Sequence, residues 1–118
     1  MRWPALRAAL LAAAIGIAGC GHGGRTMGRA SFGETIPIAG ARAAGGASPV
    51  TIEGSMIEKC PVAGCWFILR DRTGAMKVDT KAAGFAVVDV PLRTRIRVAG
   101  RVREEGTEPI LEADGLSY

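Results

Sequence analysis

The sequence is short of the side chains that most enzymes use for proton transfer. It has one histidine, His22, among 118 residues, and this residue lies in a Gly-rich stretch near the amino terminus. A Ser-His-Asp set requires a histidine held beside its partners, and no phosphate-binding loop occurs. The carboxylates are scattered through predicted turns and strand ends. We therefore expect a protein without catalytic activity.

Aromatic side chains are also few. Phe, Trp and Tyr together make up 5% of the chain, and Trp3 lies in a segment that we expect to be removed. Single-stranded nucleic acids are bound largely by stacking of bases on such rings. The shortage argues against a nucleic-acid partner, although the formal net charge of the whole chain is +4.

Long hydrophobic runs are missing. The apolar stretch at residues 8–18 follows Arg2 and Arg7 and is well short of the roughly 20 residues that a transmembrane helix needs. A positively charged start, a short apolar run and small residues before a cut site are the parts of a secretory signal peptide. We predict that residues 1–19 are this signal peptide.

Residues 17–20 (IAGC) resemble the lipobox of bacterial lipoproteins. The resemblance implies that the Cys20 sulfur carries diacylglycerol and that the new amino terminus receives a third chain, which gives stable membrane anchoring. The protein would face the periplasm in the cell envelope. Gly21 stands where an Asp would retain such a lipoprotein at the inner membrane, so we expect the outer membrane.

Processing lowers the charge and leaves one small domain. Loss of Arg2 and Arg7 takes Lys+Arg from 15 to 13 against 11 acidic residues, so the net charge falls from +4 to +2. Residues 20–48 are rich in Gly, Ala and Arg, and such a composition buries too little apolar surface to fold. We predict a flexible tether with one short edge strand at residues 32–38, followed by a domain at residues 49–118.

From residue 49 onward, apolar and polar residues alternate and turn residues recur every eight to twelve positions, which predicts an all-β domain. The predicted strands are residues 50–58, 65–71, 75–80, 85–90, 93–98 with 101–103, and 110–113. Gly54 and Gly100 are predicted bends. Five or six strands, a bent first strand and no convincing helix predict a small OB-like barrel. A small sandwich is the alternative.

Cys60 and Cys65 are the two cysteines that remain after lipidation of Cys20. An even pair in an oxidising compartment points to a disulfide, which would stabilise the fold by about 2 kcal/mol. One alternative is a redox-active thiol pair. Another is a soft-metal site for copper or zinc, in which Met56 or Met76 could add a thioether.

The stretch Cys60–Trp66 (CPVAGCW), with Leu69 and Asp71 after it, resembles the C-x3-GCW signature of the DUF4920 family of small exported bacterial proteins. Gly54, Gly84-Phe85 and Val98–Gly100 also fall where that family's pattern places them. The resemblance covers about residues 33–118. It implies an OB-like barrel in the cell envelope and brings no established activity.

A run of arginines is the best candidate for a binding face. Arginine alternates with β-branched or small residues at Arg93, Arg95, Arg97, Arg101 and Arg103. Trp66 alternates with Phe67, so one ring faces inward and the other outward or into a groove. OB barrels often hold oligonucleotides or oligosaccharides. An anionic envelope ligand, such as lipid head groups or lipopolysaccharide phosphate, fits the arginines, and a solvated strand face that discourages edge pairing is the alternative.

These observations predict a membrane-anchored lipoprotein with one OB-like barrel. We expect the barrel to act as a binding or assembly module for an anionic ligand or an envelope protein, without a cofactor. The alternative is a copper- or zinc-binding protein or a thiol-redox protein, and both would use Cys60 and Cys65.

Overall fold

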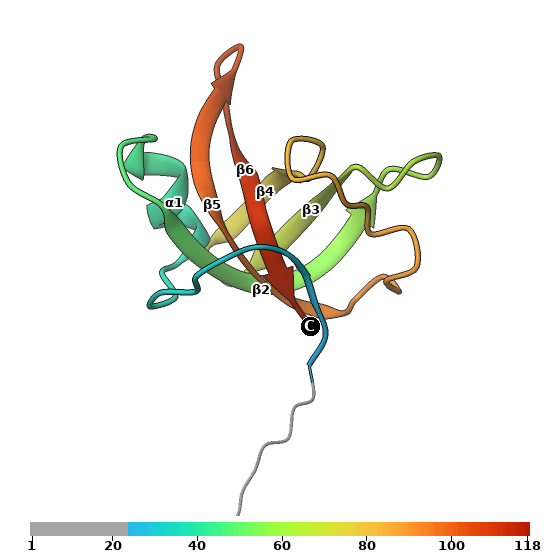
Figure 1. The fold of residues 1–118 in the computed structure, drawn as a ribbon. Coiled ribbons are helices and arrows are strands. Elements are labelled where there is room, and N and C mark those ends of the chain that lie inside the picture. Colours follow the sequence, from blue (N-terminus) through green and yellow to red (C-terminus); the bar gives the residue numbers. More distant parts are fainter. Residues whose placement is uncertain (1–23) are drawn as a thin grey trace, which may run out of the picture.

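The computed structural model describes residues 24–118, which form a closed five-stranded barrel with one extra strand and one short helix (Figure 1). The strands are β1 (Thr26–Gly28), β2 (Val50–Lys59), β3 (Trp66–Asp71), β4 (Gly74–Asp79), β5 (Arg95–Glu105) and β6 (Glu108–Ser117), and the helix is α1 (Ile38–Ala44). The all-β, OB-like prediction is confirmed. The predicted signal peptide, the lipidation site Cys20 and His22 lie outside the described residues.

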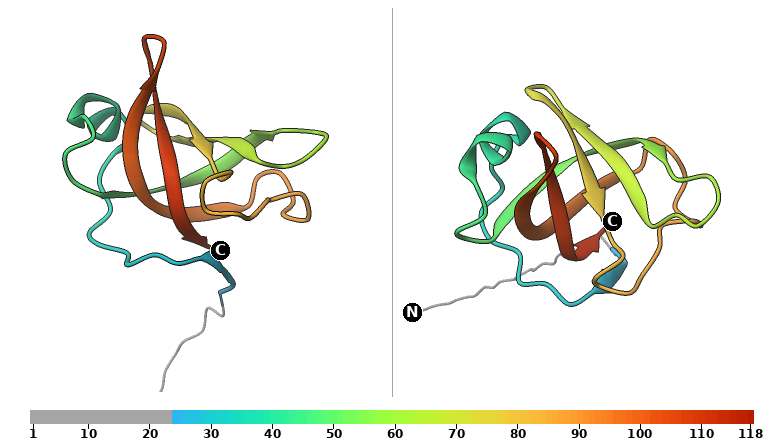
Figure 2. Two further views of the ribbon diagram at one scale, coloured as in Figure 1. Left: turned by 45° about the horizontal axis from the view of Figure 1, so that its top comes forward. Right: turned by 90° about the horizontal axis from the view of Figure 1, so that it is seen from above.

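The barrel closes because each of its five strands pairs with two others. β2 pairs antiparallel with β5 and with β3, and β3 pairs antiparallel with β4. β4 then runs parallel to β6, and β6 returns antiparallel to β5. The resulting ring is seen from above in Figure 2 (right). The domain therefore has one closed sheet and not the two facing sheets of the alternative sandwich.

The predicted bend of the first strand falls where β2 changes partner. β2 faces β5 up to Ser55 and faces β3 from Ser55 onward. A Cβ atom at Gly54 would lie 2.3 Å from the carbonyl oxygen of Arg70, so only glycine allows β3 this close. The β2–β3 register shifts after Met56, and the β5–β6 register shifts at Gly100. Such irregularities add the local twist that closing a small barrel needs.

The interior is filled by inward-facing residues of the strands, by α1 and by the loop between β4 and β5. Its largest fully buried side chains are Phe67, Ile38, Ile52, Met56, Leu69, Met76, Ile96, Leu111, Leu116, Val78 and Val87. The strand members follow the period of two predicted from the sequence, except in β6, where the register shift opposite Gly100 separates Leu111 and Ala113 from Leu116. The period therefore identifies the inward face of the strands correctly.

Residues 24–48 are part of the folded domain, which corrects the tether predicted for residues 20–48 over this range; residues 20–23 lie outside the described residues. β1 pairs with the end of β6, and α1 places Ile38 and Ala41, both fully buried, in the core. A composition with few large apolar groups predicts a flexible chain, but the burial of Ile38 and Ala41 is enough to hold this segment against the barrel. The predicted edge strand at residues 32–38 is reduced to one bridge between Thr35 and Thr51.

The start of α1 is capped by a turn that is distant in the sequence. The Ile38 N–H donates to Oδ2 of Asp71 at 2.9 Å, and the Ala39 N–H donates to Oγ1 of Thr73 at 3.0 Å. Pro37 at the N-cap position supplies no side-chain bond of its own. The β3–β4 turn therefore satisfies N–H groups that a helix otherwise leaves open. Across residues 24–118, no helix is long and apolar enough to cross a membrane.

The strand predicted for residues 85–90 is wrong, because this part of the chain forms turns. Val87 and Val90 are nevertheless fully buried, which explains the apolar pattern that suggested a strand. The Lys59 ammonium group donates to the carbonyl oxygens of Val87, Val88 and Val90. A single side chain thereby satisfies backbone groups that a neighbouring strand would otherwise bind.

Candidate functional site

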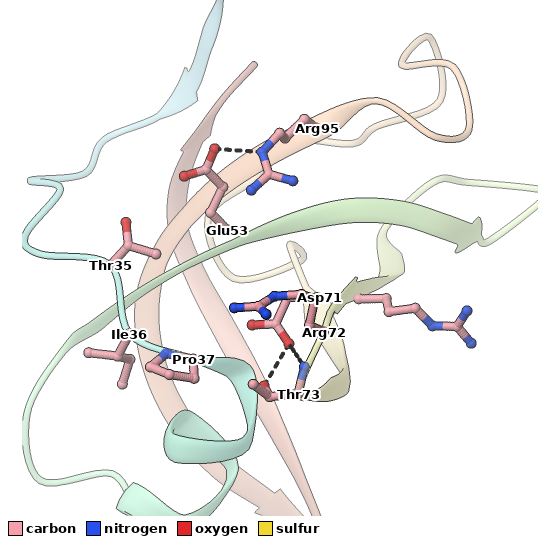
Figure 3. A pocket seen from close by; sticks show the side chains of 9 residues that line it. Thr35, Ile36, Pro37, Glu53, Asp71, Arg72, Thr73 and Arg95 are labelled. Carbon is pink, nitrogen blue, oxygen red and sulfur yellow. Dashed lines mark hydrogen bonds and ion pairs between the residues drawn. The ribbon is translucent and has the colours of Figure 1, made fainter.

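A cleft of about 560 Å³ lies between the outside of the barrel and the segment that leads into α1 (Figure 3). Its walls come from this segment, from β2, from the β3–β4 turn and from the start of β5. The lining residues are Thr35, Ile36, Pro37, Glu53, Arg70, Asp71, Arg72, Thr73 and Arg95. Three of the nine carry a guanidinium group.

Strand register places two of these arginines in one row. Ser55 on β2 lies opposite Arg70 on β3 and opposite Arg95 on β5. Residues directly opposite in neighbouring strands point to the same face of the sheet, with Cβ atoms about 5 Å apart. Arg70, Ser55 and Arg95 therefore form a row across the outside of three strands, and the two arginine stems begin roughly 10 Å apart.

The cleft carries an excess of positive charge. Nε of Arg95 lies 3.0 Å from Oε2 of Glu53. Arg70 and Arg72 are exposed, and neither forms an ion pair with another residue of the described range 24–118. The lining of the cleft thus includes three guanidinium groups and two carboxylates, those of Glu53 and Asp71.

The Asp71 carboxylate is occupied by its own turn. Oδ1 accepts hydrogen bonds from the Thr73 N–H at 2.7 Å, the Thr73 hydroxyl at 2.6 Å and the Gly74 N–H at 3.1 Å, and Oδ2 accepts from the Ile38 N–H. Burial opposes ionisation of this group. The hydrogen bonds from the Thr73 hydroxyl, Ile38, Thr73 and Gly74 outweigh that effect and hold the pKa of Asp71 below its ordinary value of 3.8. Asp71 is therefore charged but is engaged in holding the cleft floor to α1.

The arginines predicted to form one face are spread around the barrel. Arg95 lines the cleft, whereas Arg97 lies over the ring of Phe32, 5.7 Å from its centroid. Arg101 donates to a backbone carbonyl, and Arg93 lies in the turn before β5 with a φ of 76°. All but Arg93 keep to the outward-facing positions of β5, but the strand curves, so alternation does not bring them together.

Arg103 is surrounded by acidic groups. Its Nη2 lies 2.9 Å from Oδ2 of the buried Asp79, and Glu105 and Glu112 approach it at 3.7 and 3.3 Å. A guanidinium group among three carboxylates is neutralised. Arg103 therefore contributes to the structure of the barrel more than to a free basic surface.

The outer face of β3 and β4, where OB barrels bind ligands, also holds paired groups. Trp66 is half-buried, and Nζ of Lys77 lies 5.4 Å from the centroid of its ring. Nζ of Lys77 is also 3.5 Å from a carboxylate oxygen of Glu105. Phe67 is fully buried, which confirms that one ring of the pair faces inward. The Trp66 ring is thus partly covered by a cation.

Cys60 and Cys65 close the turn between β2 and β3, and both are half-buried and unbonded to each other. The Cys60 N–H donates to the carbonyl oxygen of Trp66 at 3.0 Å, and the Gly64 N–H donates to that of Cys60 at 3.2 Å. Two hydrogen bonds therefore close the loop whether or not the sulfurs are joined.

Comparison with known proteins agrees with this geometry. The family model for the bacterial OB fold (BOF) protein matches residues 22–113. The chain belongs to the BOF family. The predicted membership of a small bacterial OB-fold family is confirmed at this level.

The solved structure of the hypothetical protein ygiW from E. coli is similar to this chain. The TM-score is 0.57 and the identity 15%, over 75% of this chain and 97% of that chain. At this identity the likeness shows the fold alone. No curated protein matches the chain.

In the BOF barrel, the two methionines proposed as thioether ligands do not lie in the surface loop that carries Cys60 and Cys65. Met56 and Met76 belong to the hydrophobic core. Among residues 24–118 there is no group of three or more His, Cys, Asp or Glu side chains that could hold a metal ion. Of the residues proposed as copper or zinc ligands, only the thiols of Cys60 and Cys65 therefore remain as donors.

Arg70 and Arg72 are candidate site residues that the sequence alone does not indicate. They flank Asp71 at the end of β3, and the alternation of this strand puts Arg70 on the outside. That alternation is visible in the sequence. The proximity of Arg70 to Arg95 is not, because it depends on the register of both strands with Ser55.

Proposed function

We propose that the protein is a lipid-anchored, non-catalytic binding module of the bacterial cell envelope, and that its cleft holds a phosphate-bearing ligand. One observation carries the proposal. The row Arg70–Ser55–Arg95 sets two guanidinium groups on one outer face, and Arg72 adds a third at the edge of the same cleft.

Phosphate esters match the chemistry of this site. A guanidinium group is planar, always charged, and can donate two parallel hydrogen bonds to phosphate oxygens. Glu53 orients Arg95 through their ion pair. A volume of about 560 Å³ falls within the usual range for small-molecule sites. It suits a lipid head group or a phosphorylated sugar.

The predicted location narrows the source of the phosphate. A lipid anchor at Cys20 would hold the barrel at the membrane, where phospholipid head groups and lipopolysaccharide both present phosphate esters. The resemblance to the DUF4920 family remains a prediction. It also implies a location in the cell envelope. An outer-membrane position is proposed from Gly21, the residue after the lipidated cysteine.

Two other functions suit the surface less well. Nucleic acid needs exposed rings on which bases stack, but Trp66 on the outer OB face is partly covered by Lys77. Hydrolysis needs a free base, but the cleft carboxylates of Glu53 and Asp71 are held by Arg95 and by the β3–β4 turn. A cleft with arginines in excess and engaged carboxylates is suited to binding an anion.

The experiment compares two variants that lose the same charge. A chain beginning at Gly21 contains every described element and is mixed with vesicles of phosphatidylcholine, with vesicles that also contain phosphatidylglycerol, and with lipopolysaccharide. Binding is measured by co-sedimentation and by titration calorimetry. The double variant R70Q/R95Q removes the row, and K81Q/R101Q removes two exposed cations outside the cleft.

We expect R70Q/R95Q to lose at least about tenfold in affinity, because each charged hydrogen bond contributes roughly 1.5–3 kcal/mol. K81Q/R101Q should change affinity by less than about threefold, as screened surface charges do. Tighter binding to lipopolysaccharide or to phosphatidylglycerol identifies the source of the phosphate. Equal losses in both double variants, or no binding to either lipid, would overturn the proposal.

A further inference from the structure

The loop between β2 and β3 holds two thiols at the two ends of one short turn. Lys59 and Phe67 are paired across the strands, and Cys60 and Trp66 continue the pairing through a 3.0 Å hydrogen bond. Cys65 is next to Trp66, so the two cysteines lie at neighbouring positions where the strands meet. In Figure 2 (left) this loop projects from the side of the barrel.

The loop between β2 and β3 is held by the segment that follows β4. A Cβ atom at Gly64, whose φ is 64°, would lie 2.7 Å from the backbone nitrogen of Val88, so this turn needs glycine. The Val87 N–H donates to the carbonyl oxygen of Gly64 at 2.8 Å, and the Thr80 N–H donates to that of Cys65 at 2.9 Å. The carbonyl groups that face the barrel are therefore engaged.

The backbone of the loop also affects the acidity of one of the two thiols. The backbone N–H groups of Ala63, Val62 and Gly64, in that order, stabilise the Cys60 thiolate and lower the pKa of Cys60 from its ordinary value of 9.0 to about 7. A helix N-terminus activates a thiol in the same way. The charged residues on the surrounding elements are Glu58, Lys59, Asp79, Lys81 and Asp89. The lowering comes from the backbone and not from these side chains.

Exposed apolar groups lie beside the thiols. Val62, within the loop, has 86% of its surface exposed, and Val88, which contacts the loop at Gly64, has 49%. Cys60 and Cys65 are themselves half-exposed. A disulfide-bearing molecule can therefore reach Cys60 without any rearrangement of the barrel.

We propose that Cys60 and Cys65 form a thiol–disulfide exchange site, in which Cys60 is the attacking thiol and Cys65 the resolving thiol. This function is independent of the arginine cleft. It differs from a structural staple because the pair reacts reversibly with disulfides of other molecules.

The exchange has two steps. The Cys60 thiolate attacks one sulfur of a disulfide R–S–S–R, forms a mixed disulfide and displaces one RS⁻ group. The Cys65 thiol loses its proton to solvent, attacks the Cys60 sulfur and displaces the second RS⁻ group. The protein's two thiols are oxidised to one disulfide, R–S–S–R is reduced to two thiols, and the two released protons go to those thiols.

The same loop makes the reverse reaction easy. Cys60 is a good leaving group because the N–H groups of the loop stabilise its thiolate, and thiols of low pKa leave faster. Stabilisation of the reduced form also makes the disulfide more oxidising. The Cys60–Cys65 bond should therefore be reduced by small thiols faster than a buried structural disulfide.

The test uses the chain from Gly21, reduced and then exposed to glutathione disulfide at several pH values, with peptide mapping by mass spectrometry. In Cys65→Ser, a glutathione adduct should accumulate on Cys60, with a rate that rises through a midpoint near pH 7. In wild type the adduct should be transient and give way to the Cys60–Cys65 disulfide. Cys60→Ser should form an adduct on Cys65 more slowly.

The unfolded chain in denaturant is the matched reference, because its thiols lack the loop. At pH 7 a thiol of pKa about 7 is half ionised, against about 1% for a thiol of pKa 9, and its lower nucleophilicity offsets part of this gain. We expect the folded Cys60 to react about fivefold faster than in the unfolded chain. Faster modification of Cys65 than Cys60 in the folded wild type, or a persistent glutathione adduct without an internal disulfide, would overturn the proposal.

Discussion

Asp71 connects three parts of the molecule through one carboxylate. It closes the β3–β4 turn through Thr73 and Gly74, caps the start of α1 through Ile38, and lies in the floor of the arginine cleft. Each of these contacts uses the charged form. A single ionised side chain therefore couples the seating of the helix to the shape of the cleft.

Asp71→Asn should lower the free energy of unfolding by about 1 kcal/mol at pH 7, because an amide nitrogen cannot accept the Ile38 N–H bond. The pKa of Asp71 is lowered in the folded state, so its contribution is present above the unfolded value of about 3.8 and is lost as pH falls through the folded value. The difference between wild type and Asp71→Asn should shrink below about pH 4. Urea unfolding at several pH values measures it.

Asp89→Asn is the matched control, because Asp89 is exposed in the loop before β5. It should leave the unfolding free energy unchanged across the same pH range. If the difference for Asp71→Asn stayed constant from pH 7 to pH 3, the carboxylate would not be the group that couples the turn to α1.

At the residue scale, the sequence predicts well whether a side chain faces inward or outward. It predicts poorly which other side chains lie beside it. The alternation of Trp66 and Phe67 predicts that one ring is buried, because side chains on a strand alternate between faces. It does not identify Arg70 as a partner of Arg95, since their proximity depends on two strand registers set by bends and turns elsewhere. The arginines of β5 are predicted correctly as surface residues but not as members of different surfaces.

At the scale of an element, the helix α1 shows that composition does not predict a helix that depends on tertiary contacts. Seven residues rich in Ala and Gly would not form a stable helix alone. The helix forms because Ile38 and Ala41 enter the core and because its first N–H groups bind Asp71 and Thr73, more than thirty residues away. No local pattern contains that information.

Ile38→Ala should reduce the free energy of unfolding by about 2–5 kcal/mol, because it leaves a cavity in a fully buried site. The control is Ala43→Ser, at an exposed position of the same helix, for which we expect less than about 0.5 kcal/mol. Chemical denaturation of both variants gives the comparison. Equal stability of Ile38→Ala and wild type would restore the tether that the sequence suggests for this segment.

The loop between β4 and β5 gives the opposite case, in which an apolar pattern suggests a strand that does not form. Val87 and Val90 are spaced to fill the core from turns. The Lys59 ammonium group binds three carbonyl oxygens of the loop, so the backbone needs no strand partner there. Sequence periodicity reports burial and does not by itself distinguish a strand from a buried loop.

At the scale of the whole molecule, the OB-like barrel was predictable because its signals are local and repeated, whereas its closure was not. Alternating strands, tight turns and a glycine at the bend of the first strand are each visible in the sequence. The cleft was not predictable, because it forms where the segment before α1 crosses the outer surface of the barrel beside three strands. Its residues come from four separate parts of the chain.

The barrel also distributes charge unevenly over its outer surface. On the β4–β5–β6 side, Arg103 and Lys77 are paired with acidic residues. At the cleft, Arg70 and Arg72 have no ion pair within residues 24–118. An anionic ligand therefore meets fewer competing carboxylates at the cleft than on the outer face that OB barrels commonly use.

The measurement that tests the central claim most directly is a nuclear magnetic resonance titration of the chain from Gly21 with glycerol phosphate. Backbone N–H and arginine Nε–H signals report where the probe binds. The account predicts saturable shifts at Ser55, Arg70–Thr73 and Arg95. Shifts centred on Trp66, Lys77 and Arg103, or spread evenly over all exposed cations, would contradict a phosphate site in the cleft.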